Sequence, residues 1–224
     1  MPAALTATYE KDSVPNLPAA EDGNDTICDW VSNQTSEQLY SLNGFTHSVK
    51  PQDDYESYMY DAVQDLHNDN ILNDNDHIIL VDALALDGYG RIYPNGSINL
   101  DGNEYYVCRV TGNGAAVSSE ETRYMAMHEL GHTLGLDHED GDYEISEAST
   151  GATFPDDMTL MSVPYIQTDR SFNACDGFIG GRSDPPSDFC SVSNYEVDKA
   201  GSNYLDKYSD GCGRGIVEDH LEGL

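Results

Sequence analysis

One stretch of this 224-residue chain places three histidines, a glutamate and a glycine at a spacing that suits metal chemistry: His128-Glu129-x-x-His132-x-x-Gly135-x-x-His138. Residues four apart share one face of an α-helix, so His128 and His132 can offer two imidazole nitrogens to one ion. Glu129 lies one step round the helix, where its carboxylate can reach a metal-bound water without being a ligand. Gly135 tolerates a positive φ, which lets the helix end and brings His138 back as a third ligand.

Three nitrogen ligands leave a tetrahedral ion one open position, which is typical of catalytic zinc. The pattern therefore predicts Zn²⁺ on His128, His132 and His138, with a bound water whose pKa falls to about 7. Glu129 would take the proton as this water attacks a scissile carbonyl and would deliver it to the leaving amine. In a chain of this composition the full pattern arises by chance with a probability on the order of 10⁻⁵ to 10⁻⁴, so we set aside the alternative that these histidines are ordinary helix residues.

This string resembles the metzincin clan of zinc endopeptidases, and Gly131, Leu136 and His138 look most like the matrixin-type branch. The resemblance implies an α+β fold in which a mixed twisted sheet and two long helices form an upper lobe. A small, irregular lower lobe with a C-terminal helix would complete it. We expect one catalytic domain over residues 1–224, divided into an upper lobe (1–138, with the active-site helix) and a lower lobe (139–224).

The hydrophobic patterns of the first half predict the elements that must position the motif. The first are an extended arm or short strand in residues 1–26, an ordered stretch from Cys28 and Trp30, and an amphipathic helix from Gln52 to Leu72. A buried central strand from His77 to Asp82 follows, and then an edge strand from Asp87 to Pro94 closed by an Asn95–Gly96 turn. The last are a strand from Tyr105 to Val110 and the active-site helix from Ser118 or Ser119. His47, His67 and His77 are isolated, and we interpret them as surface or strand-end residues rather than ligands.

The resemblance also assigns residues to the substrate and to the floor of the site. In metzincins a substrate backbone pairs with the strand at this point, so Gly90, Arg91, Ile92 and Tyr93 are the expected substrate-binding residues. Met161 matches the Met-turn beneath the three histidines. Val163, Pro164 and Tyr165 would line the pocket for the side chain that follows the scissile bond, and Tyr165 is not expected to ligate zinc.

The second half contains a loop flanked by Cys175 and Cys190, a predicted last helix from Ser193 to Tyr208, and a glycine-rich stretch from Gly211 to Gly215 expected to end it. Five cysteines without a C-x-x-C pair permit two disulfides and one thiol, and argue against a second, thiolate-bound zinc. Matrixin-type latency places a propeptide cysteine on the zinc. The surroundings of Cys28 do not match that pattern, which favours a disulfide or a buried thiol.

Net charge is the most unusual bulk property, with 10 Lys and Arg against 41 Asp and Glu, a balance of −31. The carboxylates are spread along the whole chain, and molar salt would screen their repulsion to about 3 Å, so we interpret the surface as that of a halophile. The lack of a basic patch argues against nucleic acid as a partner. No membrane segment or signal peptide is apparent, which fits either a mature secreted form with a start codon supplied or an intracellular protein. From the resemblance we expect the mature, extracellular (secreted) form, and we also expect a monomer.

Three questions stay open at this level. The oxygen-rich segment from Asp82 to Asp101 could hold Ca²⁺, as matrixin-type domains do in this region, or its carboxylates could simply be solvated. A non-catalytic protein that binds zinc or peptides could share the scaffold, although it would not need Glu129. An exopeptidase would carry the same motif as an endopeptidase.

Overall fold

The computed structural model describes residues 1–9, 14–83, 90–115, 117–136, 143–145, 155–158, 165–166, 172–173 and 212–224. Its centre is a five-stranded sheet in the order β2-β1-β3-β5-β4. The strands are β1 (Ala3–Thr8), β2 (Tyr40–Thr46), β3 (His77–Asp82), β4 (Gly90–Leu100) and β5 (Asn103–Thr111). All neighbours run parallel except β4, which is antiparallel to β5. The sheet is therefore mixed, as predicted, with β3 at its centre and β4 at one edge.

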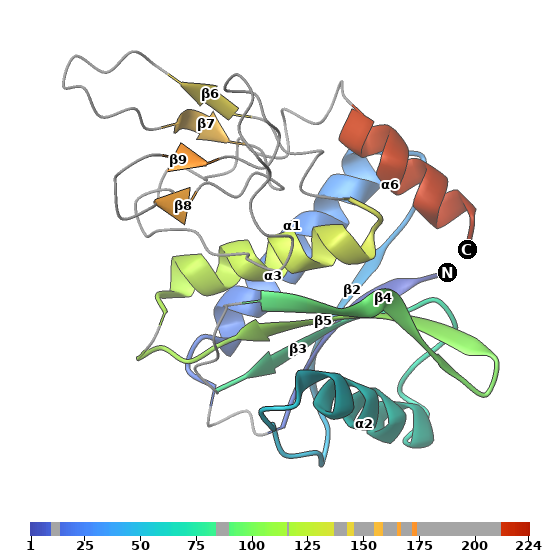
Figure 1. Cartoon of the computed structure of the whole chain (residues 1–224). Helices are drawn as coiled ribbons and strands as arrows, with labels where there is room; N and C mark the ends of the chain where they lie inside the picture. The colour runs from blue at the N-terminus through green and yellow to red at the C-terminus, as the bar shows by residue number, and fades with distance from the viewer. Residues whose placement is uncertain are drawn as a thin grey trace.

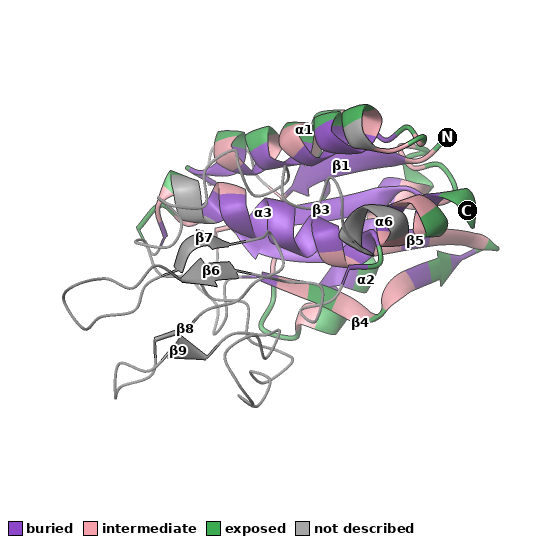
Figure 2. Ribbon diagram, turned by 90° about the horizontal axis from the view of Figure 1, so that it is seen from above, coloured by how far each residue is buried: buried purple, intermediate pink, exposed green. Residues whose placement is uncertain are grey.

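Helices cover both faces of the sheet (Figure 1), which explains why β3 is buried along its whole length. Because successive strand residues point to opposite faces, Ile79 and Val81 pack with helices α1 (Leu17–Gln34) and α3 (Ser119–Thr133), whereas Ile78 and Leu80 pack with α2 (Tyr55–Asn68). Figure 2 shows α1 and α3 lying over one face of the sheet, with buried residues in both helices. This architecture is the α+β fold expected from the sequence.

The N-terminal region differs from the prediction. The short strand exists as β1, but it is fully buried inside the sheet rather than an arm before the core. Cys28 and Trp30 do not begin an ordered stretch, since they lie within the helix α1. The prolines concealed this helix: Pro18 lies in its first turn, where a missing N–H breaks no helical hydrogen bond. Gly23 permits close packing, because a Cβ there would lie 2.7 Å from the Arg123 carbonyl oxygen of α3.

The edge strand is longer than expected. β4 does not end at Pro94 but continues to Leu100, with a shift in its pairing to β5 between Ile92 and Ser97. Asn95 and Gly96, which we predicted as a turn, have φ values of 66° and 82° inside that shift. A bulge can absorb these conformations on an edge strand, where Pro94 costs no interior ladder bond.

The C-terminal helix also differs from its prediction. Helix α6 spans Cys212–Glu222, so a helix begins in the glycine-rich stretch that was expected to end one. The predicted helix from Ser193 to Tyr208 and the Cys175–Cys190 loop lie outside the described residues. Between α3 and α6 the structure describes four short strands: β6 (Tyr143–Ile145), β7 (Pro155–Met158), β8 (Tyr165–Ile166) and β9 (Phe172–Asn173). They form two antiparallel pairs, β6 with β7 and β8 with β9.

Cysteine pairing was partly mispredicted. Cys28 and Cys108 are both free and buried, so the buried-thiol alternative for Cys28 is confirmed. The remaining cysteines are Cys175, Cys190 and Cys212, and three thiols can form at most one intramolecular disulfide. Two intramolecular disulfides are therefore excluded. The burial of Cys28 raises the pKa of its thiol to about 12, and nearby Asp25 and Asp29 add to this shift, so it is an unreactive core residue.

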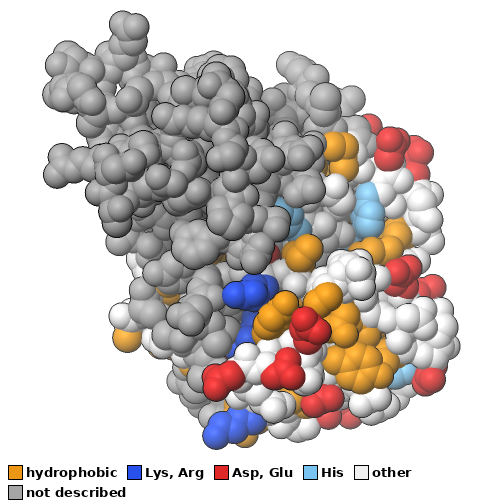
Figure 3. Space-filling view, in the orientation of Figure 1, with side chains coloured by type: hydrophobic (Ala, Val, Ile, Leu, Met, Phe, Trp, Pro, Cys, Tyr) orange, Lys and Arg blue, Asp and Glu red, His pale blue; other side chains and the backbone are white. Residues whose placement is uncertain are grey.

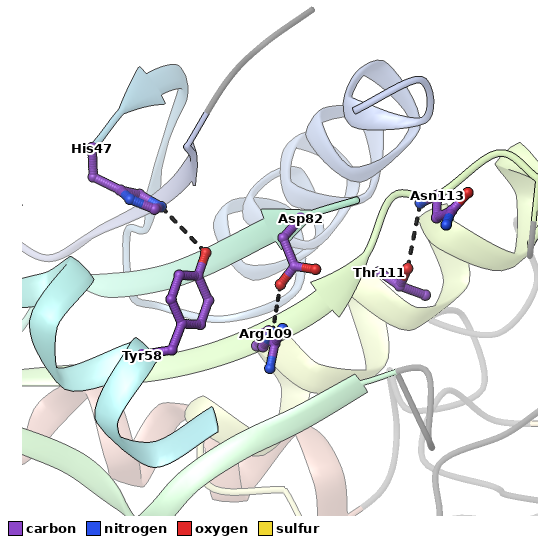
Figure 4. A network of polar contacts seen from close by, with 6 residues as sticks. All are labelled: His47, Tyr58, Asp82, Arg109, Thr111 and Asn113. Carbon is purple, nitrogen blue, oxygen red and sulfur yellow. Dashed lines mark hydrogen bonds and ion pairs between the residues drawn. The ribbon is translucent and has the colours of Figure 1, made fainter. Parts of the chain in front are cut away.

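Polar side chains form a buried network where β3 and β5 end, on the α2 face (Figure 4). The Arg109 guanidinium donates to the Asp82 carboxylate and lies 4.8 Å from the centre of the Tyr58 ring. The Tyr58 hydroxyl lies 3.4 Å from Nε2 of His47, a residue that is buried rather than on the surface. Because the Arg109–Asp82 ion pair is buried, we assign it a structural role in fixing the position of α2 on the sheet rather than a role in binding.

The outer surface of the described part is acidic and also carries apolar side chains. Figure 3 shows acidic side chains spread over this face instead of forming one patch, with hydrophobic groups among them. Tyr60 on α2 and Ile92 on β4 are among the exposed hydrophobic residues. None of the helices in the described ranges is long and apolar enough to cross a membrane.

Candidate active site

The active-site helix α3 begins at Ser119, as predicted, and packs against α1, β4 and β5. Leu130 and Leu134 lie in the core that α3 shares with α1, which fixes the rotation of the helix. With that rotation fixed, Glu129 is 1% exposed and His128 is also 1% exposed, whereas His132 is only partly buried. His128, Glu129 and His132 therefore lie at the margin of the core, where packing of α3 fixes their backbone.

The two predicted helix ligands lie next to each other. The ring centres of His128 and His132 are 4.8 Å apart and nearly perpendicular, and the His128 ring stacks on Tyr124. This is the arrangement that the four-residue spacing predicts. Two neighbouring imidazoles on one helical turn fit a shared Zn²⁺, which prefers nitrogen ligands of this kind.

The helix ends in a turn that also orients His132. Gly135 has a φ of 89°, its N–H donates to the His132 carbonyl, and the Leu136 N–H donates to the Gly131 carbonyl, each over 3.1 Å. This pair of bonds is a Schellman motif, which requires a residue such as glycine at the left-handed position. The predicted role of Gly135 in ending the helix is thus confirmed, whereas the return of the chain to bring His138 to the metal stays a prediction.

The same turn selects a tautomer for one ligand. Nδ1 of His132 lies 2.9 Å from the carbonyl oxygen of Leu136, and a carbonyl can only accept, so Nδ1 is the protonated nitrogen. Nε2 then keeps its lone pair for a metal. A histidine ligand held by a backbone carbonyl in this way is typical of zinc sites.

Helix α6 supports the turn from the outside. A Cβ added to Gly135 would lie 3.5 Å from both Ile216 Cγ2 and His220 Cβ, so both residues pack on this glycine. Asn75 donates to the Leu224 carbonyl over 3.0 Å, and the Ser36 N–H donates to Glu218 over 2.9 Å. The turn that follows the active-site helix is therefore packed against a helix from the end of the sequence.

The carboxylate of Glu129 points toward the sheet edge. A Cβ built on Gly90, the first residue of β4, would lie 2.6 Å from Glu129 Cγ and 2.7 Å from Cδ. The Glu129 charge also acts on Cys108 of β5. Burial, the larger cause, and the Glu129 charge, the smaller one, raise the pKa of the Cys108 thiol well above its usual value. The carboxylate is thus held between α3, β4 and β5.

The four expected substrate-binding residues on β4 divide between two faces. Ile92 shares the α3 face with Gly90 by alternation and is 37% exposed. Arg91 and Tyr93 point to the other face: the Arg91 guanidinium lies 4.9 Å from the centre of the Tyr55 ring, and Tyr93 packs on the α2 core. β4 is the last strand of its sheet, as predicted, so its outer backbone edge has no strand beside it among the described strands.

The other predicted site residues lie beyond the well-described part of the chain. His138, Met161, Val163 and Pro164 are outside the described residues, and Tyr165 is described only as the first residue of β8. Among the described residues, no cluster of three or more His, Cys, Asp or Glu side chains suited to a metal is found. The third ligand and the Met-turn therefore stay predictions.

Comparison with known proteins gives one match. Residues 44–149, which contain β3, β4, β5, α3 and the whole motif, match the matrixin family model. No curated protein sequence matches the chain. Matrixins are zinc-dependent metalloproteases and are typically extracellular, so this match supports Zn²⁺ as the metal and peptides or proteins as the substrate class. Over the segment that the family model matches, the chain is therefore similar to matrixin-type metzincins, which are zinc metalloproteases.

Proposed function

We propose that this protein is a zinc endopeptidase in which His128, His132 and His138 hold the metal and Glu129 is the general base. The observation that supports this proposal most directly is one turn of α3. There the imidazoles of His128 and His132 lie side by side, and Glu129 places its buried carboxylate at the edge of the sheet. When bound, zinc would supply a Lewis acid that acidifies water and polarises the scissile carbonyl.

The chain's own groups divide the remaining work. The Leu136 carbonyl orients His132 so that Nε2 can bind, and the Gly135 turn directs the chain toward His138. The Glu129 carboxylate accepts the proton of the attacking water and passes it to the amine nitrogen that leaves. The outer edge of β4, which has no strand beside it among the described strands, would align an extended peptide by backbone hydrogen bonds, and this suits cleavage within a chain.

Glu129→Gln tests the assignment of the base. The amide keeps the size of the side chain and leaves the ligands untouched, but it has no basic oxygen for the proton at neutral pH. Because one residue would serve both the attack and the departure of the amine, we expect cleavage of an internally quenched peptide to fall about 10³-fold or more. Zinc content, measured by mass spectrometry, should stay at the wild-type level.

The same assay separates the alternatives. A Glu129→Gln variant that cleaves at the wild-type rate would remove Glu129 as the base. A wild-type protein that is folded and zinc-loaded in high salt, yet binds peptides without cleaving any of a diverse library, would favour a binding protein on this scaffold. Release of only terminal residues would identify an exopeptidase.

A further inference from the structure

Gly90 occupies an unusual position, because the space where its side chain would begin is already filled. A Cβ on Gly90 would contact Glu129 Oε1 closely and would lie 2.6 Å from Cγ and 2.7 Å from Cδ. Real Cβ atoms do not approach other heavy atoms this closely. All three atoms belong to the Glu129 side chain beyond its own Cβ, so the conflict would be with the carboxylate arm and not with the helix backbone.

The backbone at Gly90 does not itself require glycine. The glycines with positive φ among the described residues are Gly44, Gly96, Gly102 and Gly135, and Gly90 is not one of them. Gly90 pairs with Val110 as an ordinary first residue of an antiparallel strand. Alanine would fit this conformation and would restrict the unfolded chain, which by itself is stabilising. The need for glycine is therefore purely steric, and it comes from Glu129.

The other walls around the carboxylate are rigid. Glu129 is 1% exposed, and Cys108, which lies on the neighbouring strand β5, is completely buried. Leu130, the next residue of α3, is also completely buried, so the helix cannot rotate to make room. A side chain at position 90 would have to displace the carboxylate arm, because the groups around it are packed in the core.

We propose that Gly90 is a positioning residue for the general base, and that its lack of a side chain fixes where the Glu129 carboxylate accepts a proton. This inference rests on the proposed role of Glu129. It also reassigns Gly90, which the sequence had suggested as a substrate-binding residue. A misplacement of about 1 Å can cost a catalytic group about 10²-fold in rate.

Gly90→Ala in the full-length, zinc-loaded protein is the direct test. We expect kcat for an internally quenched peptide to fall about 10²-fold, whereas KM and zinc content stay within about two-fold of wild type. A residue that binds substrate would instead raise KM. Gly114→Ala is the matched control, since Gly114 lies in the loop before α3, has no positive φ and would meet its nearest neighbours at 3.2 Å or more. It should leave kcat unchanged.

A double-mutant cycle with Glu129→Ala tests the contact between positions 90 and 129 through stability, without an activity assay. Alanine at position 129 removes Cγ, Cδ and both oxygens, and so removes the three atoms, Cγ, Cδ and Oε1, that a Cβ at position 90 would meet. We expect Gly90→Ala to lower the midpoint of denaturant unfolding in the wild-type background, and to leave it unchanged or raise it in the Glu129→Ala background. The cycle also covers the case in which Gly90→Ala alone does not fold, because the double variant should then regain the fold.

The outcomes are distinguishable. Wild-type kcat in Gly90→Ala, or equal destabilisation in both backgrounds, would overturn the positioning role of Gly90. Loss of kcat together with a cycle that shows strong coupling would support it. If Glu129→Gln cleaved normally, the proposed base would be wrong, while the stability cycle would still report whether the two side chains compete for one space.

Discussion

His132 illustrates how much of a metal site can be encoded in one residue and its near neighbours. Its place four residues after His128 puts the two rings together, and its Nδ1 finds the Leu136 carbonyl because Gly135 turns the chain there. All of these partners lie within nine residues along one helix and its end. A ligand that is oriented so locally loses little entropy when it binds metal.

At this scale the first expectation concerns the ligands. Replacing His128, His132 or His138 with alanine should each remove most of the zinc affinity, since a tetrahedral site with two protein nitrogens binds far more weakly than one with three. Zinc retained after dialysis against a weak chelator, measured by mass spectrometry, checks this. His67→Ala is the control, because His67 contacts Tyr105 and Asp101 away from the motif. Full zinc in His138→Ala would mean that another residue supplies the third ligand.

The sequence predicted the parts of the site that depend on local periodicity. His128, Glu129 and His132 fall where a helix must put them, and Gly135 adopts the expected φ. The contact between Gly90 and Glu129 could not be found this way, because helical or strand spacing does not tell which strand residue a helix side chain meets across the sheet. Cys28 and Cys108 were missed as a pair of free thiols for a similar reason, since only the packing shows that both are buried.

Among the described elements, the attachment of α6 to the sheet involves two histidines, His77 and His220, and should therefore respond to pH. His77 of β3 is completely buried, stacks on Tyr106 of β5 and meets His220 of α6 at a ring-centre distance of 5.6 Å. Nδ1 of His77 lies 3.0 Å from the Thr133 hydroxyl of α3, and Nε2 of His77 and of His220 are buried without hydrogen-bond partners. Burial lowers the pKa of His220, and the Glu104 charge, which raises it, partly offsets this shift.

Burial lowers the pKa of His77 to about 3, and the neighbouring His220 adds to this shift, against 6.5 for a free histidine. A base whose folded pKa is depressed stabilises the fold above its unfolded pKa and loses that contribution as the pH falls toward the folded value. We expect His77→Asn, which can keep a hydrogen bond to Thr133, to flatten the loss of unfolding free energy below pH 6.5 by about 1.4 kcal/mol per pH unit.

Denaturant unfolding of the zinc-free protein at several pH values between 7 and 4 would measure this slope, because the ligand histidines then titrate equally in both proteins. His47→Asn is the matched comparison, since burial lowers the pKa of His47 to about 4 and this histidine lies on the opposite face, against α2. Parallel pH curves for wild type and His77→Asn would show that His77 carries no part of the acid sensitivity.

Element prediction succeeded where the hydrophobic pattern was regular and failed where glycine and proline were read as breaks. β3, β5, α2 and α3 all lie where the pattern put them. Helix α1 was missed because Pro18 sits in its first turn and Gly23 at its contact with α3. The start of α6 was missed because Gly213 and Gly215 lie inside it, so tertiary packing overrides their low helix propensity.

The whole molecule carries a net charge of −31, and this sets its response to salt. Acidic groups on the visible face are dispersed, so their repulsion is spread over the surface and should respond to general screening. We expect the melting temperature to rise steeply between about 0.1 M and a few molar NaCl, as the Debye length falls from about 10 Å to about 3 Å and below. A melting temperature that does not change over this range would contradict the interpretation of a halophile's surface.

The packing of α6 on Gly135 also has a consequence for synthesis. β3, β5 and α3 leave the ribosome well before Ile216 and His220, which must arrive to pack on the Gly135 turn. Chains grow at about 5–20 residues per second, so on the order of 4–16 s pass between synthesis of Gly135 and synthesis of Ile216, which packs on it. A cell that makes this protein would thus produce helix α3 first and the residues that support its last turn only after the intervening segment. If the proposed function is right, peptide cleavage would be delayed until Ile216 and His220 had been made.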